Sequence, residues 1–146
     1  MASFERHSDV TWEGPIREGK GEAVAGTGAF TLPVTFPSRV EDPSGRTSPE
    51  ELIAAAHAAC YAMALTAALG RRNASASRLK VTATVGADFG SQGIKITSSR
   101  LKVVAEGLQG IGAADFPQFA REAEGGCPVS NALRGSLKID VDAQAV

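Results

Sequence analysis

The sequence contains only two cysteines, Cys60 and Cys127, and only two histidines, His7 and His57. So few cysteines exclude a scaffold held together by several disulfides. The two cysteines do not form a C-x-x-C pair, and with so few histidines a zinc site is a poor fit. We therefore expect any chemistry of these thiols to proceed without a metal or another cofactor.

An excess of charge of either sign is also missing, because the formal net charge is -1 at pH 7. Nothing in this balance favours binding to nucleic acid. Charged residues such as Glu5 and Asp9 argue against a signal peptide, and we read no apolar run as long enough to span a membrane. We expect a cytoplasmic protein without a nucleic-acid or membrane partner. In that reducing compartment, two cysteines are more often free thiols or redox groups than a structural disulfide.

The length of 146 residues and the hydrophobic content of 43% fit one globular domain, residues 1–146. Two alternating segments flank a turn at residues 90–93 and predict a β-hairpin. Shorter helices are expected over about 113–124 and 127–133. The expected strands are residues 10–13, 21–24, 30–34, 79–85, 94–104 and 137–141. This order predicts an α+β domain in which antiparallel sheets pack around one long helix.

The start of that long helix carries the clearest local signal, after a polar connector over residues 37–48. Ser48 is placed to cap the helix, Pro49 suits its first position, and Glu51 is placed to bond back to the Ser48 amide. We expect the helix to run to about Leu69 and to end at Gly70. Its residues are apolar nearly all round, which predicts a buried helix.

The two cysteines lie in different local settings. Cys60 lies among alanines of the long helix, where burial raises the pKa of a thiol and leaves it inert unless a cation approaches. Arg39 and Arg46 in the connector are the candidates, and composition alone does not choose between them. Cys127 precedes Pro128 at an expected helix start, where exposed amides favour a thiolate, and the glycines at 125–126 would let it move.

Helix geometry separates the two neighbouring glutamates. At about 100° per residue, Glu51 lies roughly 180° from Cys60, whereas Glu50 lies about 80° from it. At a rise of about 1.5 Å per residue, Glu50 is still roughly 15 Å from Cys60 along the axis. Glu50 can therefore serve a Cys60 site only through another residue or across a two-fold axis from a second chain, and we favour the second arrangement.

Two segments resemble a known family. Residues 47–65, TSPEELIAAAHAACYAMAL, resemble the active-site helix of the OsmC/Ohr family of thiol-dependent peroxidases, and residues 123–133, AEGGCPVSNAL, resemble its second cysteine motif. The similarity extends to Trp12-Glu13-Gly14 and to the order of elements over nearly the whole chain. The sequence around His57 and Cys60 is more similar to the OsmC branch than to the Ohr branch.

The resemblance implies specific roles for four residues. Cys60 would attack the peroxide and become a sulfenic acid, and Cys127 would condense with it to a disulfide. Arg39 would hold the thiolate, with Glu50 as its carboxylate partner. The family fold is an intertwined homodimer with the site at the subunit interface, and related enzymes make a lipoyl-type dithiol a plausible reductant.

These observations predict a cysteine-based peroxidase that reduces organic hydroperoxides, hydrogen peroxide or both, and that is recycled by an external thiol. His57 is read as a hydrogen-bonded core histidine, because a thiolate held by arginine needs no base. The alternative is a dimeric module that binds a small apolar ligand and whose thiols are incidental. Hydrolysis with Cys60 as nucleophile is less suitable, because His57 lies about 60° round the same helix.

Overall fold

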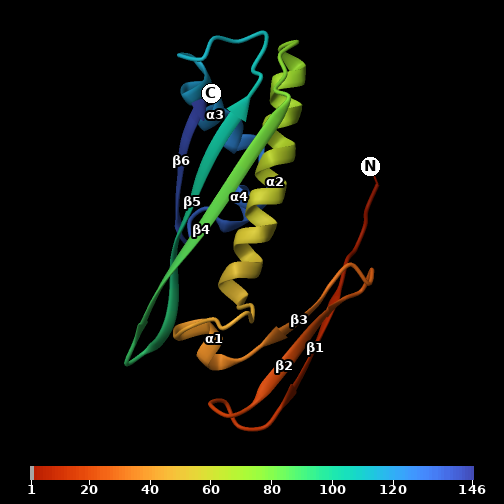
Figure 1. Cartoon of the computed structure of the whole chain (residues 1–146), viewed down its shortest axis with the longest axis vertical. Helices are drawn as coiled ribbons and strands as arrows, with labels where there is room; N and C mark the ends of the chain where they lie inside the picture. Colours follow the sequence, from red (N-terminus) through yellow and green to blue (C-terminus); the bar gives the residue numbers. More distant parts are fainter. Residues whose placement is uncertain (1) are drawn as a thin grey trace. The chain divides into compact units, whose positions relative to one another are not determined.

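The computed structural model describes residues 2–146 and shows a mixed α+β fold with two three-stranded sheets and a long helix (Figure 1). The expected fold class is correct at this level. The chain divides into two compact units, the first ending at Leu52 and the second comprising Ile53–Val146.

The first unit contains an antiparallel sheet in the order β1-β2-β3. Its strands are β1 (Ser8–Glu13), β2 (Lys20–Ala25) and β3 (Thr31–Val34). A short helix, α1 (Phe36–Val40), follows in the segment that was expected to be an irregular connector. Thr35 caps α1, and the Thr35 and Ser38 side chains each accept a hydrogen bond from the other residue's backbone amide. This capping box places Arg39 on a helix and not on a loose loop.

The long helix is α2 (Pro49–Arg71). As expected, the Ser48 hydroxyl accepts a hydrogen bond from the Glu51 amide at 3.2 Å. The other half of the predicted capping box is wrong, because the Glu51 carboxylate accepts instead from the Thr47 hydroxyl at 2.7 Å. The predicted end at Gly70 is also wrong, since the left-handed residue after the helix is Asn73, with φ 54°.

The second unit contains a sheet in the order β4-β5-β6. Its strands are β4 (Arg78–Gly90), β5 (Gly93–Glu106) and β6 (Lys138–Ala145). The predicted hairpin joins β4 to β5, but β6 pairs with β5 in parallel. The expectation of purely antiparallel sheets is therefore wrong. Between β5 and β6 the chain forms three helical segments, and this crossover brings β6 into the sheet in the direction of β5. They are α3 (Phe116–Ala123), η1 (Glu124–Gly126) and α4 (Pro128–Leu133).

The core of the second unit lies between α2, the sheet and α3. Side chains from all three are at most 2% exposed, namely Tyr61, Leu65, Leu69, Leu101, Val103 and Phe116. Cys127 belongs to the same buried cluster and Cys60 packs against it. The core therefore brings together the two segments that carry the cysteines.

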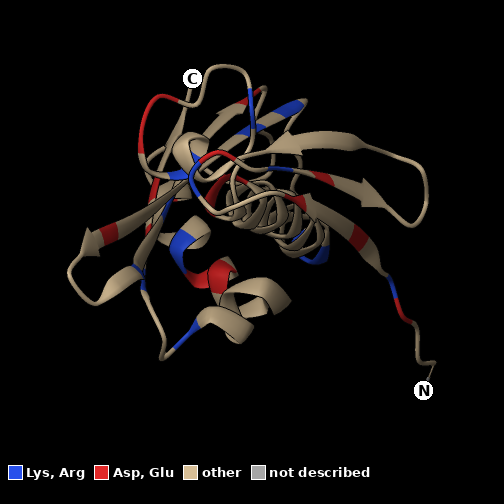
Figure 2. Cartoon of the chain, turned by 90° about the horizontal axis from the view of Figure 1, so that it is seen from below, with Lys and Arg blue, Asp and Glu red and all other residues tan. Residues whose placement is uncertain are grey.

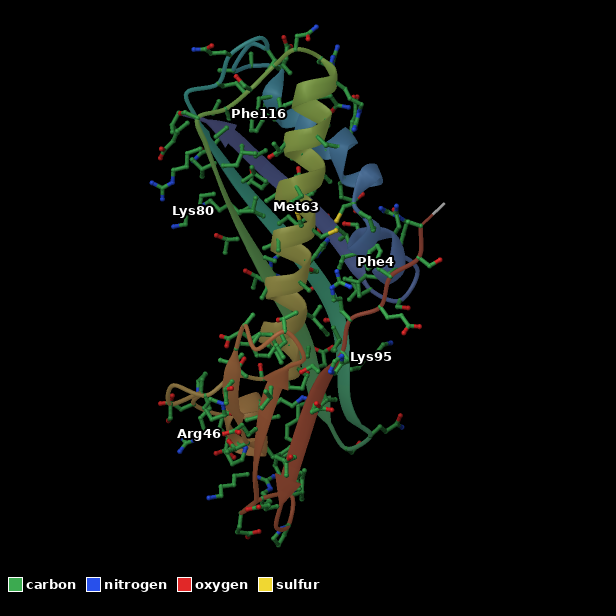
Figure 3. All side chains as sticks on the ribbon, turned by 90° about the vertical axis from the view of Figure 1, so that its right-hand side faces the viewer. Phe4, Arg46, Met63, Lys80, Lys95 and Phe116 are labelled. Carbon is green, nitrogen blue, oxygen red and sulfur yellow. The ribbon has the colours of Figure 1, made fainter. Side chains whose placement is uncertain are left out.

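Burial along α2 is one-sided within the chain. The buried residues of the helix are His57, Tyr61, Leu65 and Leu69. Met63, labelled on α2 in Figure 3, is 68% exposed, and Ala55, Ala59 and Ala67 are exposed as well. The prediction of a helix buried all round is therefore wrong for the single chain, whose sheet and α3 cover only one face of α2.

The exposed face of α2 is apolar. The sequence has no charged residue between Glu51 and Arg71, and in Figure 2, where α2 is seen nearly end-on, most of its coil has the colour of uncharged residues. By length and composition, α2 could cross a membrane. The expectation that no apolar run reaches that length is therefore wrong. A core helix of a globular protein passes the same test, so this is weak evidence for a membrane span.

Candidate active site

Cys60 and Cys127 meet in the second unit. The Cys60 thiol, on α2, packs against the buried cluster that contains Cys127, and the Cys127 thiol and the Val129 backbone both act on its pKa. Cys127 is the N-cap of α4, as predicted, and its sulfur accepts from the Ser130 amide at 3.5 Å. Both thiols are free, Cys127 is fully buried and Cys60 is half-buried. Two neighbouring backbone amides of α4 thus interact with the two sulfurs, that of Val129 with Cys60 and that of Ser130 with Cys127.

The surroundings of Cys60 favour its protonated form. Burial is the main cause that raises the pKa of the Cys60 thiol, and the neighbouring Cys127 raises it further. The hydrogen bond from the Val129 backbone acts in the opposite direction and lowers this pKa, but it does not offset the burial. The sequence-based expectation of a raised thiol pKa is confirmed, and a nearby cation would be needed to obtain a thiolate at neutral pH.

His57 lies on α2, three residues before Cys60, in a buried polar cluster. Its Nδ1 is 2.6 Å from the Ser99 hydroxyl of β5, and its Nε2 is 2.7 Å from the Ser130 hydroxyl of α4. All three side chains are fully buried. Burial lowers the pKa of His57, and Glu124 partly opposes this shift. The reading of His57 as a satisfied core histidine is confirmed, whereas its partners Ser99 and Ser130 were not predicted.

Arg39 and Glu50 form an ion pair in the first unit. The Arg39 Nε donates to both Glu50 oxygens, at 2.9 and 3.1 Å, and a terminal nitrogen of Arg39 lies 2.8 Å from Oε1. Their side chains are 29% and 13% exposed, so the pair is partly shielded from water. Of the two candidate arginines, Arg39 is the one that meets Glu50. The structure thus assembles the four predicted residues as two pairs, one in each unit, and their catalytic roles stay predictions.

A second ion pair, between Arg134 and Glu124, was not predicted. The Arg134 guanidinium lies 2.6 Å from the carboxylate of Glu124, whose side chain is 11% exposed. The hydrogen bond to Glu124 is the main cause that raises the pKa of Arg134, and the charge of Glu124 and the neighbouring Cys127 act in the same direction. The pair therefore joins η1 to the end of α4. The residues come from η1 and from the position after α4, and no local motif links them.

Among residues 2–146, no three or more His, Cys, Asp and Glu side chains gather closely enough to hold a metal ion. The described site therefore consists of two thiols, backbone amides, a neutral imidazole with two hydroxyls, and charged pairs. Such a set suits thiol chemistry.

Comparisons with known proteins connect this arrangement to a family. The family model described as OsmC-like protein matches residues 42–142. The chain is 39% identical to peroxiredoxin OsmC of Escherichia coli (strain K12) over 139 residues, which cover 94% of this chain and 96% of that protein. It is 31% identical to organic hydroperoxide resistance protein OhrA of Bacillus subtilis (strain 168), over 86% of this chain and 87% of that one.

Solved structures show the same fold. An organic hydroperoxide resistance protein OsmC of Legionella pneumophila superimposes with a TM-score of 0.75 at 22% identity, covering 99% of both chains. OhrB of Bacillus subtilis gives a TM-score of 0.72 at 22% identity, covering 94% of this chain and 98% of that chain. From the family match and the identity with peroxiredoxin OsmC together, the chain belongs to the OsmC family.

Proposed function

We propose that this protein is a cysteine-based peroxidase in which Cys60 reduces a hydroperoxide and Cys127 resolves the product to an intramolecular disulfide. The observation that carries the proposal is the direct meeting of the two free thiols, which come from separate helices. The names of the relatives, peroxiredoxin OsmC and organic hydroperoxide resistance protein OhrA, support a peroxidase-type function and a hydroperoxide substrate.

The reaction begins at Cys60. Its thiolate attacks one peroxide oxygen, the O–O bond breaks, and the alcohol or water leaves with the second oxygen and a proton, so that Cys60 becomes a sulfenic acid. The Cys127 thiolate then attacks the Cys60 sulfur, the S–O bond breaks, and hydroxide leaves as water after taking up a proton. An external thiol, which we propose to be a dithiol of the lipoyl type, reduces the disulfide and completes the cycle.

Arg39 supplies the positive charge that a buried Cys60 needs. Guanidinium groups stay charged when partly buried and can contact a carboxylate and a thiolate together. Because Arg39 already bonds to Glu50 through two of its nitrogens, its guanidinium is oriented before a peroxide arrives. We propose that this pair faces a Cys60 thiolate, supplied either by the same chain or by a partner chain.

We further propose that the active form is a homodimer with α2 at its interface. The exposed side of α2 carries a stripe of small or flexible apolar side chains, Ala55, Ala59, Met63 and Ala67, at helical spacing. Burial of such a stripe against a second copy removes apolar surface from water. Met63→Asp is expected to convert a dimer into a monomer in sedimentation experiments, whereas Thr82→Asp, at an exposed position of β4, leaves the mass unchanged.

The enzymatic proposal has a direct test. The reduced protein is mixed with one equivalent of cumene hydroperoxide or hydrogen peroxide, and free thiols and sulfur oxidation states are followed by mass spectrometry. We expect the wild type to lose both thiols to a Cys60–Cys127 disulfide. Cys60→Ser should consume no peroxide, and Cys127→Ser should stop at the Cys60 sulfenic acid, which a further excess of peroxide then oxidises to sulfinic acid. Two unreacted thiols in the wild type would instead favour the binding module for an apolar ligand.

A further inference from the structure

We propose that His57 is a positioning residue for disulfide formation, which holds the first turn of α4, and with it Cys127, against Cys60 through Ser130. This inference rests on the proposed peroxidase function. It assigns a role to a buried polar cluster that the reaction itself does not use. The imidazole acts through Ser130 and takes no proton from either thiol.

The first support is the connectivity of the cluster. His57 belongs to α2, Ser99 to β5 and Ser130 to α4, and the imidazole joins the two hydroxyls at 2.6 and 2.7 Å. One ring therefore ties three elements of the second unit together. The sheet residue Ser99 fixes the ring from one side, so that its other nitrogen is presented to α4 in a defined direction.

The second support is the spacing along each helix. His57 is three residues before Cys60 on α2, and Ser130 is three residues after Cys127 at the start of α4. Positions three apart lie on the same face of a helix, about one turn from each other. The His57–Ser130 bond therefore joins the turn of α2 that carries Cys60 to the first turn of α4, which Cys127 caps. In this way it sets the distance between the two thiols.

Ser130 connects the cluster directly to the resolving sulfur. Its hydroxyl meets the imidazole, while its backbone amide donates to the Cys127 sulfur at 3.5 Å. The next residue towards the N-terminus, Val129, hydrogen-bonds the Cys60 thiol through its backbone. A shift of Ser130 would thus first displace its own amide from the Cys127 sulfur.

The chain around Cys127 has few constraints of its own, so the position of Cys127 depends on the bond between His57 and Ser130. The segment before it contains Gly125 and Gly126, and an added Cβ at either glycine would meet no atom within 4 Å. Helix α4 itself has only six residues. Besides the bond to His57, the described side-chain links of this region are the Arg134–Glu124 ion pair and the hydrogen bond from the Asn131 side-chain amide to the Gly125 carbonyl at 3.1 Å, and both join α4 to η1 and not to α2 or the sheet. Without the bond to His57, the hinge-like glycines would let the first turn of α4 move away from Cys60.

The imidazole can make both hydrogen bonds without a charge. A neutral histidine offers one donor and one acceptor, and each serine hydroxyl can play either role. Burial lowers the pKa of His57, so the neutral form prevails at neutral pH even though the charge of Glu124 acts in the opposite direction. The titratable groups around the cluster are Glu124, Tyr61 and the two thiols, and none of them is required to exchange a proton with His57.

The consequence concerns the second chemical step. Disulfide formation requires the Cys127 thiolate to approach the Cys60 sulfenic acid in line with the S–O bond that breaks. Since displacements of about 1 Å can slow a reaction by about a hundredfold, loss of the His57–Ser130 bond is expected to slow this step by at least about tenfold. The first step, attack of Cys60 on peroxide, uses none of these contacts apart from the Val129 amide and is expected to change by less than about threefold.

The test compares Ser130→Ala with Tyr61→Phe in rapid-quench experiments. Both variants lose a buried hydrogen bond of α2, but the Tyr61 hydroxyl donates to the Ala120 carbonyl of α3 at 2.6 Å, whereas the Ser130 hydroxyl belongs to α4. The reduced proteins are mixed with cumene hydroperoxide, quenched with dimedone and an alkylating reagent, and analysed by mass spectrometry. This separates the rate of sulfenic acid formation from the rate of disulfide formation.

For Ser130→Ala we expect near-normal sulfenic acid formation, disulfide formation at least about tenfold slower, and more sulfinic acid at high peroxide. Ser130→Thr keeps the hydroxyl and should restore most of the rate. Ser99→Ala should give a smaller slowing in the same direction, and it serves as the test if Ser130→Ala does not fold. Tyr61→Phe should form the disulfide at the wild-type rate.

Each contrary result has a definite meaning. Wild-type disulfide formation in both Ser130→Ala and Ser99→Ala would overturn the role of His57 while the peroxidase proposal stands. Equal slowing in Tyr61→Phe would overturn it as well, because the effect would then be general destabilisation. Failure of the wild type to form any sulfenic acid or disulfide would instead overturn the proposed function.

Discussion

The Arg39–Glu50 ion pair should contribute measurably to the stability of the fold. The two side chains make contacts of 2.8 to 3.1 Å and are 29% and 13% exposed. Hydrogen bonds to charged groups contribute about 1.5–3 kcal/mol each, and partial exposure reduces this. A double-mutant cycle with Arg39→Gln and Glu50→Gln should therefore give a coupling energy of about 1–3 kcal/mol.

The assay is urea unfolding at one fixed protein concentration, because association would make the apparent stability depend on concentration. A matched control lies in the same unit, where Arg17 and Glu41 are 3.2 Å apart but 56% and 58% exposed. The equivalent cycle for this exposed pair should give less than about 1 kcal/mol. A coupling for Arg39 and Glu50 no larger than that of the control would refute the argument that shielding makes this pair strong.

Three further predictions follow from single features. Because burial lowers the pKa of His57, the unfolded state takes up the proton first, and the unfolding free energy should fall as the pH drops below about 6.5. Urea titrations at several pH values measure this fall, and His57→Gln should lose the part of the pH dependence that comes from His57. Because Cys127 is fully buried and Cys60 is not, a monothiol should attack the Cys60 sulfur of the disulfide, so an adduct found on Cys127 would contradict this expectation. Gly110→Ala should lower the stability by about 1–3 kcal/mol, because Gly110 has a φ of 84° and its Cβ would lie 2.8 Å from the Ala74 Cα; thermal unfolding tests this.

Features with a strong local signal could be predicted from the sequence. Pro49 after a capping serine predicted the start of α2, and the alternation around residues 90–93 predicted the β4–β5 hairpin, because both depend on neighbouring residues only. Helix α1 had a similar signal in Thr35, Pro37 and Ser38, which could have been recognised as a capping box. The family is confirmed by the comparisons, and the cysteine motifs were sufficient to indicate it.

Features that depend on distant parts of the chain could not be predicted in the same way. The parallel pairing of β6 with β5 follows from the path of the crossover, and the alternation within β6 is the same for either direction. The apolar pattern of α2 predicted burial, but only one face has covering atoms within the chain, and the other requires a partner that the pattern does not specify. Helix α2 continues past Gly70 to Arg71, and the residue with the left-handed backbone that follows it is Asn73.

The sequence by itself determined the two cysteines, their helical settings, the Arg39 and Glu50 candidates and the family. Only the tertiary structure decided which groups meet: Cys60 with Cys127, Arg39 with Glu50, and His57 with Ser99 and Ser130. A serine has the same local preferences whether it faces water or a buried imidazole. Its partner is set by how the sheet and helices pack, and this packing depends on contacts between residues far apart in the chain.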